Sequence, residues 1–112
     1  MLIGTVVVAH GNIGMEMVRV ARSIVTDAAP MVGVALEHDE DVLRMREKIS
    51  AAISEVDRGG GILLLSDMFG GTPSNLCLSF LEEGRIEMIT GVNLPMCIKL
   101  ASFRGERPLA EI

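Results

Sequence analysis

The 112-residue sequence contains no tryptophan and no tyrosine, and phenylalanine occurs only three times. It also contains no basic cluster: ten lysines and arginines stand against fifteen aspartates and glutamates, for a net charge of −5. Surfaces that bind nucleic acid interleave basic side chains with aromatic ones, and anionic membranes attract basic patches. We therefore expect no nucleic-acid partner and no binding to an anionic membrane surface.

Long apolar runs are absent as well. No stretch approaches the ~20 residues that a helix needs to cross a bilayer, and the N-terminus has neither the basic start nor the cleavage site of a signal peptide. We expect a cytoplasmic protein without direct membrane insertion. The two cysteines, Cys77 and Cys97, lie far apart and form no metal motif, so we interpret them as buried reduced thiols. Two histidines are too few for a zinc site, and no metal ion is expected.

Hydrophobic residues make up 49% of the sequence, enough for one packed domain over residues 1–112. Apolar runs alternate with helical patterns in the order 2–9, 13–26, 31–36, 38–56, 62–66, 72–84, 85–90 and 93–100. Such alternation predicts a parallel sheet with right-handed crossovers and helices on both faces. The runs 2–9 and 62–66 are the most uniformly apolar, which places them centrally. The sequence therefore predicts a doubly wound α/β fold with strand order 2-1-3-4.

Two polar residues follow the two central strands. His10 ends the first apolar run and Asp67 ends the third. Because the carboxyl ends of parallel strands lie at one edge of a sheet, these residues are expected to meet there. A carboxylate that accepts the proton of one ring nitrogen fixes the tautomer and leaves the other nitrogen free. Asp67 would thus orient His10 as a nucleophile.

Glycine-containing turns follow both residues. Backbone N–H groups at Gly11 and Asn12, and from Gly70 through Gly71 to Thr72, would converge at helix N-termini and form an anion site. Thr72 is predicted to cap the third helix, with a proline at its first position. No P-loop and no nucleophile elbow is present. Histidine, carboxylate and anion cradle together indicate phosphohistidine chemistry.

Each of these features also has a plainer interpretation. A histidine at a strand end is often a turn residue, an aspartate can be a cap, and paired glycines mark many loops. A receiver-like domain phosphorylated on Asp67 is a further alternative, although the acidic cluster that would bind magnesium is missing. His38, within an acidic run, is interpreted as a solvated loop residue. Met68 and Phe69 could form an apolar rim that seats a partner protein.

Three segments resemble the IIA component of the mannose-family sugar phosphotransferase system: VVVAHGNIG at 6–14, LLLSDMFGGTPSN at 63–75 and ITGVNLPM at 89–96. The spacing between His10 and the D-x-[FW]-G-G-[ST]-P-x-N segment makes the resemblance specific. It implies a doubly wound α/β fold in which a histidine accepts a phosphoryl group from the phosphocarrier protein HPr and passes it to a histidine of the IIB component. By position, the acceptor is His10, the orienting aspartate is Asp67 and the hydroxyl residue near the phosphate is Thr72.

The resemblance implies no metal, nucleotide or other cofactor at this step, and a role in sugar uptake within a membrane-associated complex. Thr72 stands where serine is common. Family members usually continue with another helix that helps to build a dimer, whereas this sequence ends at Ile112. We expect a homodimer, weaker than that of a longer relative. The alternative function is a regulatory or dihydroxyacetone-kinase-linked phosphocarrier domain that is not directly coupled to transport.

Overall fold

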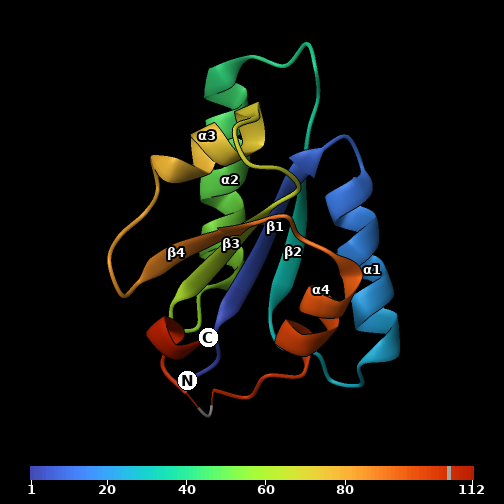
Figure 1. Ribbon diagram of the computed structural model, residues 1–112, viewed down its shortest axis with the longest axis vertical. Coiled ribbons are helices and arrows are strands. Elements are labelled where there is room, and N and C mark those ends of the chain that lie inside the picture. Colours follow the sequence, from blue (N-terminus) through green and yellow to red (C-terminus); the bar gives the residue numbers. More distant parts are fainter. Residues whose placement is uncertain (106) are drawn as a thin grey trace.

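The structure is a computed structural model that describes residues 1–105 and 107–112 (Figure 1). Four parallel strands form one sheet in the order β2-β1-β3-β4, as the sequence predicts. The elements are β1 (Gly4–His10), α1 (Ile13–Ile24), β2 (Met31–Leu36), α2 (Val42–Val56), β3 (Ile62–Ser66), α3 (Thr72–Leu78), β4 (Ile86–Thr90), α4 (Leu94–Ala101) and the short 3-10 helix η1 (Leu109–Glu111).

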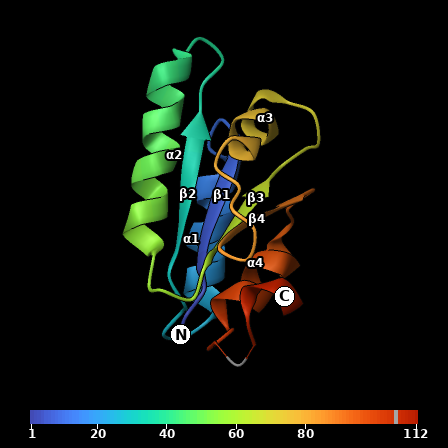
Figure 2. The ribbon, with the colours of Figure 1, turned by 90° about the vertical axis from the view of Figure 1, so that its left-hand side faces the viewer.

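Helices cover both faces of the sheet (Figure 2). Alternate residues of a strand point to opposite faces, so the central strand β1 serves two cores. Val6 and Val8 pack with α2 and α3, whereas Val7 packs with α1 and α4. Because both faces of β1 and β3 are buried, these strands read as continuous apolar runs. The doubly wound architecture follows from that pattern.

The bounds of β1, α2 and α3 differ most from the sequence-based expectation, and other element ends differ by one or two residues. Strand β1 begins at Gly4 and includes His10, and α2 begins only at Val42, after Asp41 caps it by accepting the Leu43 N–H at 3.0 Å. Helix α3 ends at Leu78 instead of Gly84. The amides that follow it bond to carbonyls three residues back, and the chain then closes a turn in which Glu82 pairs with Ile86.

The buried face of α1 also differs from the expected one. The sequence spacing by three and four residues predicts one buried face made of Ile13, Met17, Val20, Ala21 and Ile24. In the structure both isoleucines are exposed. The residues of α1 that are buried are Gly14, Val18 and Ala21. Small residues allow this helix to approach the sheet closely, and the longer side chains flank the contact.

Gly33 of β2 marks the closest approach between α1 and the sheet. A Cβ atom at this position would lie 2.6 Å from Cα and 2.7 Å from N of Met15, inside the helix backbone. We expect Gly33→Ala to force α1 outward and to lower the free energy of unfolding by about 1–3 kcal/mol, as overpacked cores do. Urea unfolding followed by circular dichroism measures the change. An unchanged unfolding midpoint would show that α1 can shift away from the strand without loss of stability.

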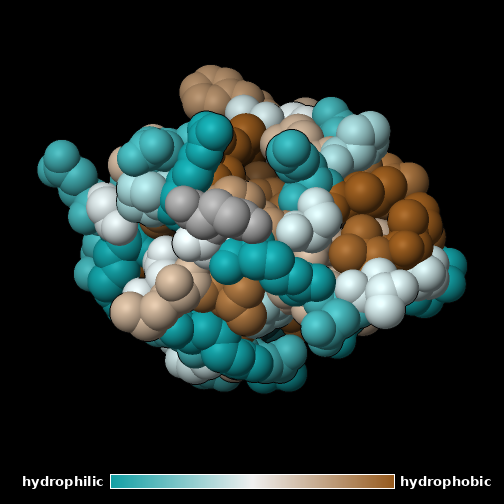
Figure 3. Space-filling model, turned by 90° about the horizontal axis from the view of Figure 1, so that it is seen from below, coloured by the Kyte–Doolittle hydropathy of each residue, from teal (hydrophilic) through white to brown (hydrophobic). Residues whose placement is uncertain are grey.

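Both chain termini lie at the end of the sheet opposite the carboxyl ends of the strands (Figure 1). Viewed from that end, the surface is mostly polar and charged, and apolar residues gather toward one side (Figure 3). Among the described helices, none has the length and apolar character needed to span a membrane. The carboxyl edge of the sheet is therefore left free of both termini.

Candidate functional site

The site is built at the carboxyl ends of β1 and β3. These strands are adjacent and parallel, with Val8 paired to Ser66, so His10 and Asp67 emerge side by side at this edge. Gly11 follows His10 with φ +55°, a conformation that favours glycine and turns the chain into α1. The expected meeting of the histidine with the carboxylate is thus present in the structure.

Asp67 holds His10 through two contacts. Its Oδ2 lies 2.8 Å from Nδ1 of the ring and accepts the backbone N–H of His10 at 3.1 Å. Its Oδ1 accepts the N–H of Met68 at 3.1 Å. A carboxylate can only accept, so Nδ1 carries the ring proton and the lone pair is on Nε2. The side chain of His10 is 53% exposed whereas that of Asp67 is 16% exposed, so the orienting group is sheltered and the nucleophile is accessible.

The electrostatics of Asp67 support this assignment. Partial burial raises the pKa of this carboxyl, but hydrogen bonds from the ring and the backbone N–H of His10 outweigh the burial. The pKa of Asp67 therefore lies below its ordinary value. The group is ionised throughout the neutral range and available to balance a positive charge on the ring.

A cavity of about 270 Å³ opens beside His10. Helix α3 forms one wall through Thr72 and Pro73, and the loop between β2 and α2 forms another through Glu37 and His38. Gly11, Leu36 and Met45 complete the lining. Asp67 is bonded to Nδ1, so Nε2 occupies the other side of the ring, next to Gly71. His10 therefore shares this cavity with the polar side chains of Thr72, Glu37 and His38.

The amides expected to cradle an anion differ in their availability. The Gly11 N–H donates to the Leu36 carbonyl at 3.0 Å, and the Gly70 N–H donates to Oγ of Ser74 at 2.9 Å. These two amides shape the turns and are occupied in this structure. Within residues 1–105 and 107–112, the amides of Asn12, Gly71 and Thr72 have no such acceptor.

Thr72 is not the helix cap that its sequence position suggests. The N-cap is Gly71, and Thr72 is already the first residue of α3. Its side chain is exposed and lines the cavity instead of bonding to its own helix. Ser74, which the sequence-based site left out, holds the turn by accepting from Gly70 and donating to the Gly71 carbonyl at 3.2 Å. Its position three residues after the second of the paired glycines is the sequence feature from which this role could have been predicted.

Gly71 is placed against the ring of His10. A Cβ atom here would lie 3.2 Å from Cε1 and 3.6 Å from Nε2 of His10, although the backbone of Gly71 at φ −85° suits any residue. We expect Gly71→Ala to fold normally but to push the ring away from its position, slowing any reaction at Nε2 roughly ten- to a hundredfold. Rapid-quench phosphorylation kinetics, with unfolding as the folding control, measure this. A wild-type rate would show that the ring tolerates the methyl group.

Met68 and Phe69 lie in the turn that carries Asp67, with 54% and 81% of each residue exposed. Their exposure leaves both apolar side chains available to a partner protein, as the sequence-based hypothesis of a partner surface requires. His38 lies in an exposed turn, as expected, but it also lines the cavity. The pairing of His10 with Leu36 explains this, because His38 comes only two residues after Leu36.

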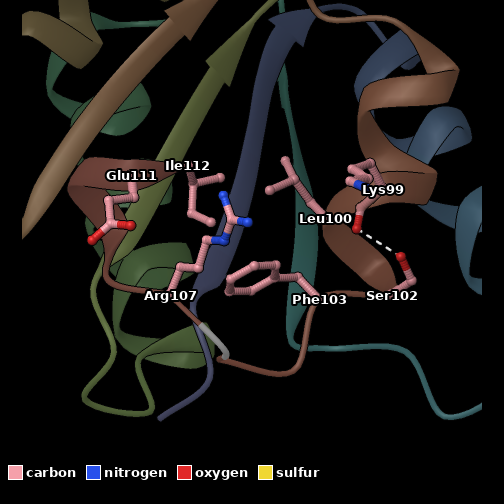
Figure 4. Close-up of a pocket in the computed structure, with 7 residues that line it drawn as sticks. All are labelled: Lys99, Leu100, Ser102, Phe103, Arg107, Glu111 and Ile112. Atoms are coloured by element: carbon pink, nitrogen blue, oxygen red, sulfur yellow. Dashed lines mark hydrogen bonds between the residues drawn. The ribbon is translucent and has the colours of Figure 1, made fainter.

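Other chemistry-bearing residues lie away from this site. Cys77 and Cys97 are buried free thiols, and burial raises the pKa of Cys77 to about 12 and also raises that of Cys97. A larger cavity of about 540 Å³ lies between α4 and the C-terminal segment, where Arg107 extends between Leu100, Phe103 and Ile112 (Figure 4). It lies at the end of the sheet that carries the termini and contains no histidine. The His10 edge remains the candidate site.

Comparisons with known proteins agree with this geometry. The fructose-specific EIIA component of the phosphotransferase system (PTS) of Bacillus subtilis (strain 168) is 28% identical over 112 residues, covering 99% of this chain and 77% of that protein. The mannose-specific EIIAB component of Escherichia coli (strain K12) is 26% identical over 109 residues, covering 96% of this chain. The match covers 34% of the E. coli protein, so the chain spans about a third of that relative's length.

The fold is shared with the PTS IIA protein associated with the fucose utilization operon from Streptococcus pneumoniae. The TM-score is 0.84 at 24% sequence identity, over 99% of this chain and 85% of that one. The family model described as PTS system fructose IIA component matches residues 4–112. Because this match takes in nearly the whole sequence, including both glycine turns and the His10–Asp67 pair, the chain belongs to the EIIA-man family of IIA components of sugar phosphotransferase systems.

Proposed function

We propose that the protein is a cytoplasmic phosphocarrier that accepts a phosphoryl group from HPr on Nε2 of His10 and passes it to a histidine of a IIB component. The observation that carries the proposal is the 2.8 Å contact between Nδ1 of His10 and Oδ2 of Asp67. This contact holds the proton on Nδ1 and leaves the lone pair on Nε2, in a residue that lines the cavity.

The reaction is a displacement at phosphorus. The Nε2 lone pair forms the new P–N bond while the P–N bond of phospho-HPr breaks, and the imidazole of HPr leaves with that electron pair. The proton on Nδ1 of His10 stays in its hydrogen bond to Asp67. The positive charge that develops on the ring is balanced by the Asp67 carboxylate, whose lowered pKa keeps it ionised. Transfer to IIB is the same exchange in the opposite direction.

The phosphoryl oxygens would be held by the amides of Asn12, Gly71 and Thr72 and by the Thr72 hydroxyl, with Gly11 and Gly70 shaping the two turns. Phosphoryl transfer depends mainly on position and on stabilising charge at these oxygens. The start of α3 adds the partial positive charge of a helix N-terminus. Met68 and Phe69 border this site and would contact HPr and IIB in turn.

The test is reconstitution from purified components. The protein is incubated with phosphoenolpyruvate, enzyme I and HPr, and the gain of one phosphoryl group is followed by mass spectrometry. A phosphoramidate on histidine survives alkali and is lost in acid, whereas an acyl phosphate on Asp67 would be lost in alkali. Passage of the label to a IIB protein supports transport; co-purification with a transcription or kinase partner instead would favour the regulatory alternative.

We also propose a homodimer. Strand β4 is an edge strand, and an apolar groove of about 420 Å³ runs beside it, lined in part by Ile89, Met96, Leu100 and Ile112. A second subunit would cover this edge. We expect light scattering over a dilution series to show a weak dimer, and we expect phosphorylation of His10 to persist after dissociation, since β1 and β3 of one chain supply the pair. Loss of transfer in step with dissociation would mean that the partner completes the site.

A further inference from the structure

A second histidine shares the cavity that opens beside His10. His38 lines it from the loop between β2 and α2, facing the wall made by Thr72 and Pro73 of α3. Resting on the proposed function, we infer that His38 contacts the phosphoryl group carried by His10, and that its protonated ring makes the state of that group dependent on pH.

The turn that carries His38 is held in place. The Glu40 N–H donates to the Glu37 carbonyl at 3.2 Å, and the Glu37 N–H donates to Oε1 of Glu40 at 3.1 Å. The same Glu40 carboxylate receives Nζ of Lys48 from α2 at 2.8 and 3.0 Å, and Lys48 also donates to the Ala35 carbonyl. The backbone that carries His38 therefore lies in a braced turn, and ordering its side chain against a ligand costs little backbone entropy.

The charges of the cavity lining indicate that a phosphoryl group on His10 would be stabilised by a nearby cation. The α3 wall supplies the amide and the hydroxyl of Thr72 but no charged side chain, and the wall from the loop between β2 and α2 carries the Glu37 carboxylate. A phosphoryl dianion on Nε2 would be repelled by that carboxylate. Of the described residues that line the cavity, His38 is the one besides His10 whose side chain can become positive. Its N–H would donate a charge-assisted hydrogen bond to a phosphoryl oxygen.

Other charged groups surround His38 and set the background of its titration. The loop carries the carboxylates of Glu37, Asp39, Glu40 and Asp41. Helix α2 carries the cations of Arg44 and Lys48, and the edge of the sheet carries His10 with Asp67. Imidazole is the side chain whose charge changes between pH 5 and 8, so the contact is strong at acidic pH and lost as the pH rises.

The coupling is reciprocal and gives two readouts. A cation beside the phosphoryl group lowers the pH at which that group loses its last proton, and the dianion raises the pH at which His38 loses its own. Linkage requires each of these effects to accompany the other. The protein is phosphorylated with phosphoramidate, a small donor that needs no HPr. The phosphoryl titration is followed by phosphorus NMR and the His38 titration by nitrogen-correlated proton NMR.

We expect His38→Gln to raise the midpoint of the phosphoryl titration by about 0.5 pH units, the size of a partly exposed charge-assisted contact. His38→Lys, which stays positive, should restore the low midpoint. Asp39→Asn is the matched control: it changes the net charge of the same turn at a residue outside the cavity lining, and should leave the midpoint near that of the wild type. In wild type, phosphorylation should raise the His38 midpoint, and His10→Ala should abolish that rise.

Equal midpoints in wild type and His38→Gln would overturn the inference while leaving the carrier function intact. A shift in Asp39→Asn as large as that in His38→Gln would also overturn it, because the effect would then be one of loop charge alone. Uptake of a phosphoryl group from phospho-HPr by His10→Ala would contradict the proposed function, whatever the behaviour of His38.

Discussion

His10→Ala is expected to take up no phosphoryl group from phospho-HPr, the largest effect of any single substitution in this chain. The lone pair on Nε2 is the proposed nucleophile, and within the described residues the other histidine, His38, has no carboxylate bonded to its ring to fix its tautomer. Mass spectrometry after incubation with phosphoenolpyruvate, enzyme I and HPr measures the uptake.

The fold should survive this substitution. The His10 side chain is 53% exposed, and the backbone N–H that bonds to Asp67 remains in alanine. Removal of an exposed side chain away from the core changes stability by roughly 0.5 kcal/mol or less. Unfolding curves provide the control, so that a loss of labelling is not a loss of structure. Alkali-labile label on the variant would move the reaction to Asp67 and favour the receiver-like alternative.

Asp67→Asn is expected to slow transfer from phospho-HPr by about 10²–10⁴, by analogy with other carboxylates that orient a catalytic histidine. Asparagine can present its NH2 to the ring, which favours the tautomer with the proton on Nε2 and removes the nucleophilic lone pair. It also leaves the developing ring charge unbalanced. Rapid-quench kinetics measure the rate, and Asp39→Asn supplies the same change of charge on an exposed turn.

The same variant tests the electrostatics of Asp67 through pH. Because the folded-state pKa of Asp67 is lowered, its contacts add stability that is fully present above the unfolded value of about 3.9 and disappears as pH falls through the folded pKa. The stability difference between wild type and Asp67→Asn should be constant near neutrality and shrink in acid. A difference that grew toward low pH would contradict the direction of that pKa shift.

In the kinetic experiment, a transfer rate of Asp67→Asn equal to that of the wild type would show that Asp67 is only a turn residue.

The strand order and the meeting of His10 with Asp67 could be predicted because burial on both faces leaves a recognisable apolar pattern in the central strands. Strands buried on both faces must be continuously apolar, so β1 and β3 stand out, and polar residues that follow them must lie at the sheet edge. The meeting of His10 with Asp67 is a consequence of parallel pairing alone. The apolar spacing predicted the burial of Ala21 but not the rest of the buried face of α1, since Gly14 is buried by close approach to the sheet and has no side chain to signal it.

Hydrogen-bond assignments within the turns were also beyond the sequence. Whether the amides of Gly11 and Gly70 face an anion depends on Leu36 and Ser74, which occupy them. The end of α3 was misplaced because residues after Leu78 keep helical spacing while their amides tighten onto nearer carbonyls. His38 looked like loop surface because its position beside His10 arises from the register of β1 against β2, a long-range pairing with no local signature.

One consequence follows from the way a single oxygen of Asp67 binds both the ring and the backbone N–H of His10. Because Asp67 is bonded to Nδ1, Nε2 is the ring nitrogen left for reaction. In the proposed carrier, the phosphoryl donor and the phosphoryl acceptor must bind at the same surface and cannot bind at the same time. The two partners then compete for one binding site. An excess of unphosphorylated donor would slow transfer to the acceptor, as a shortage of phosphorylated donor would.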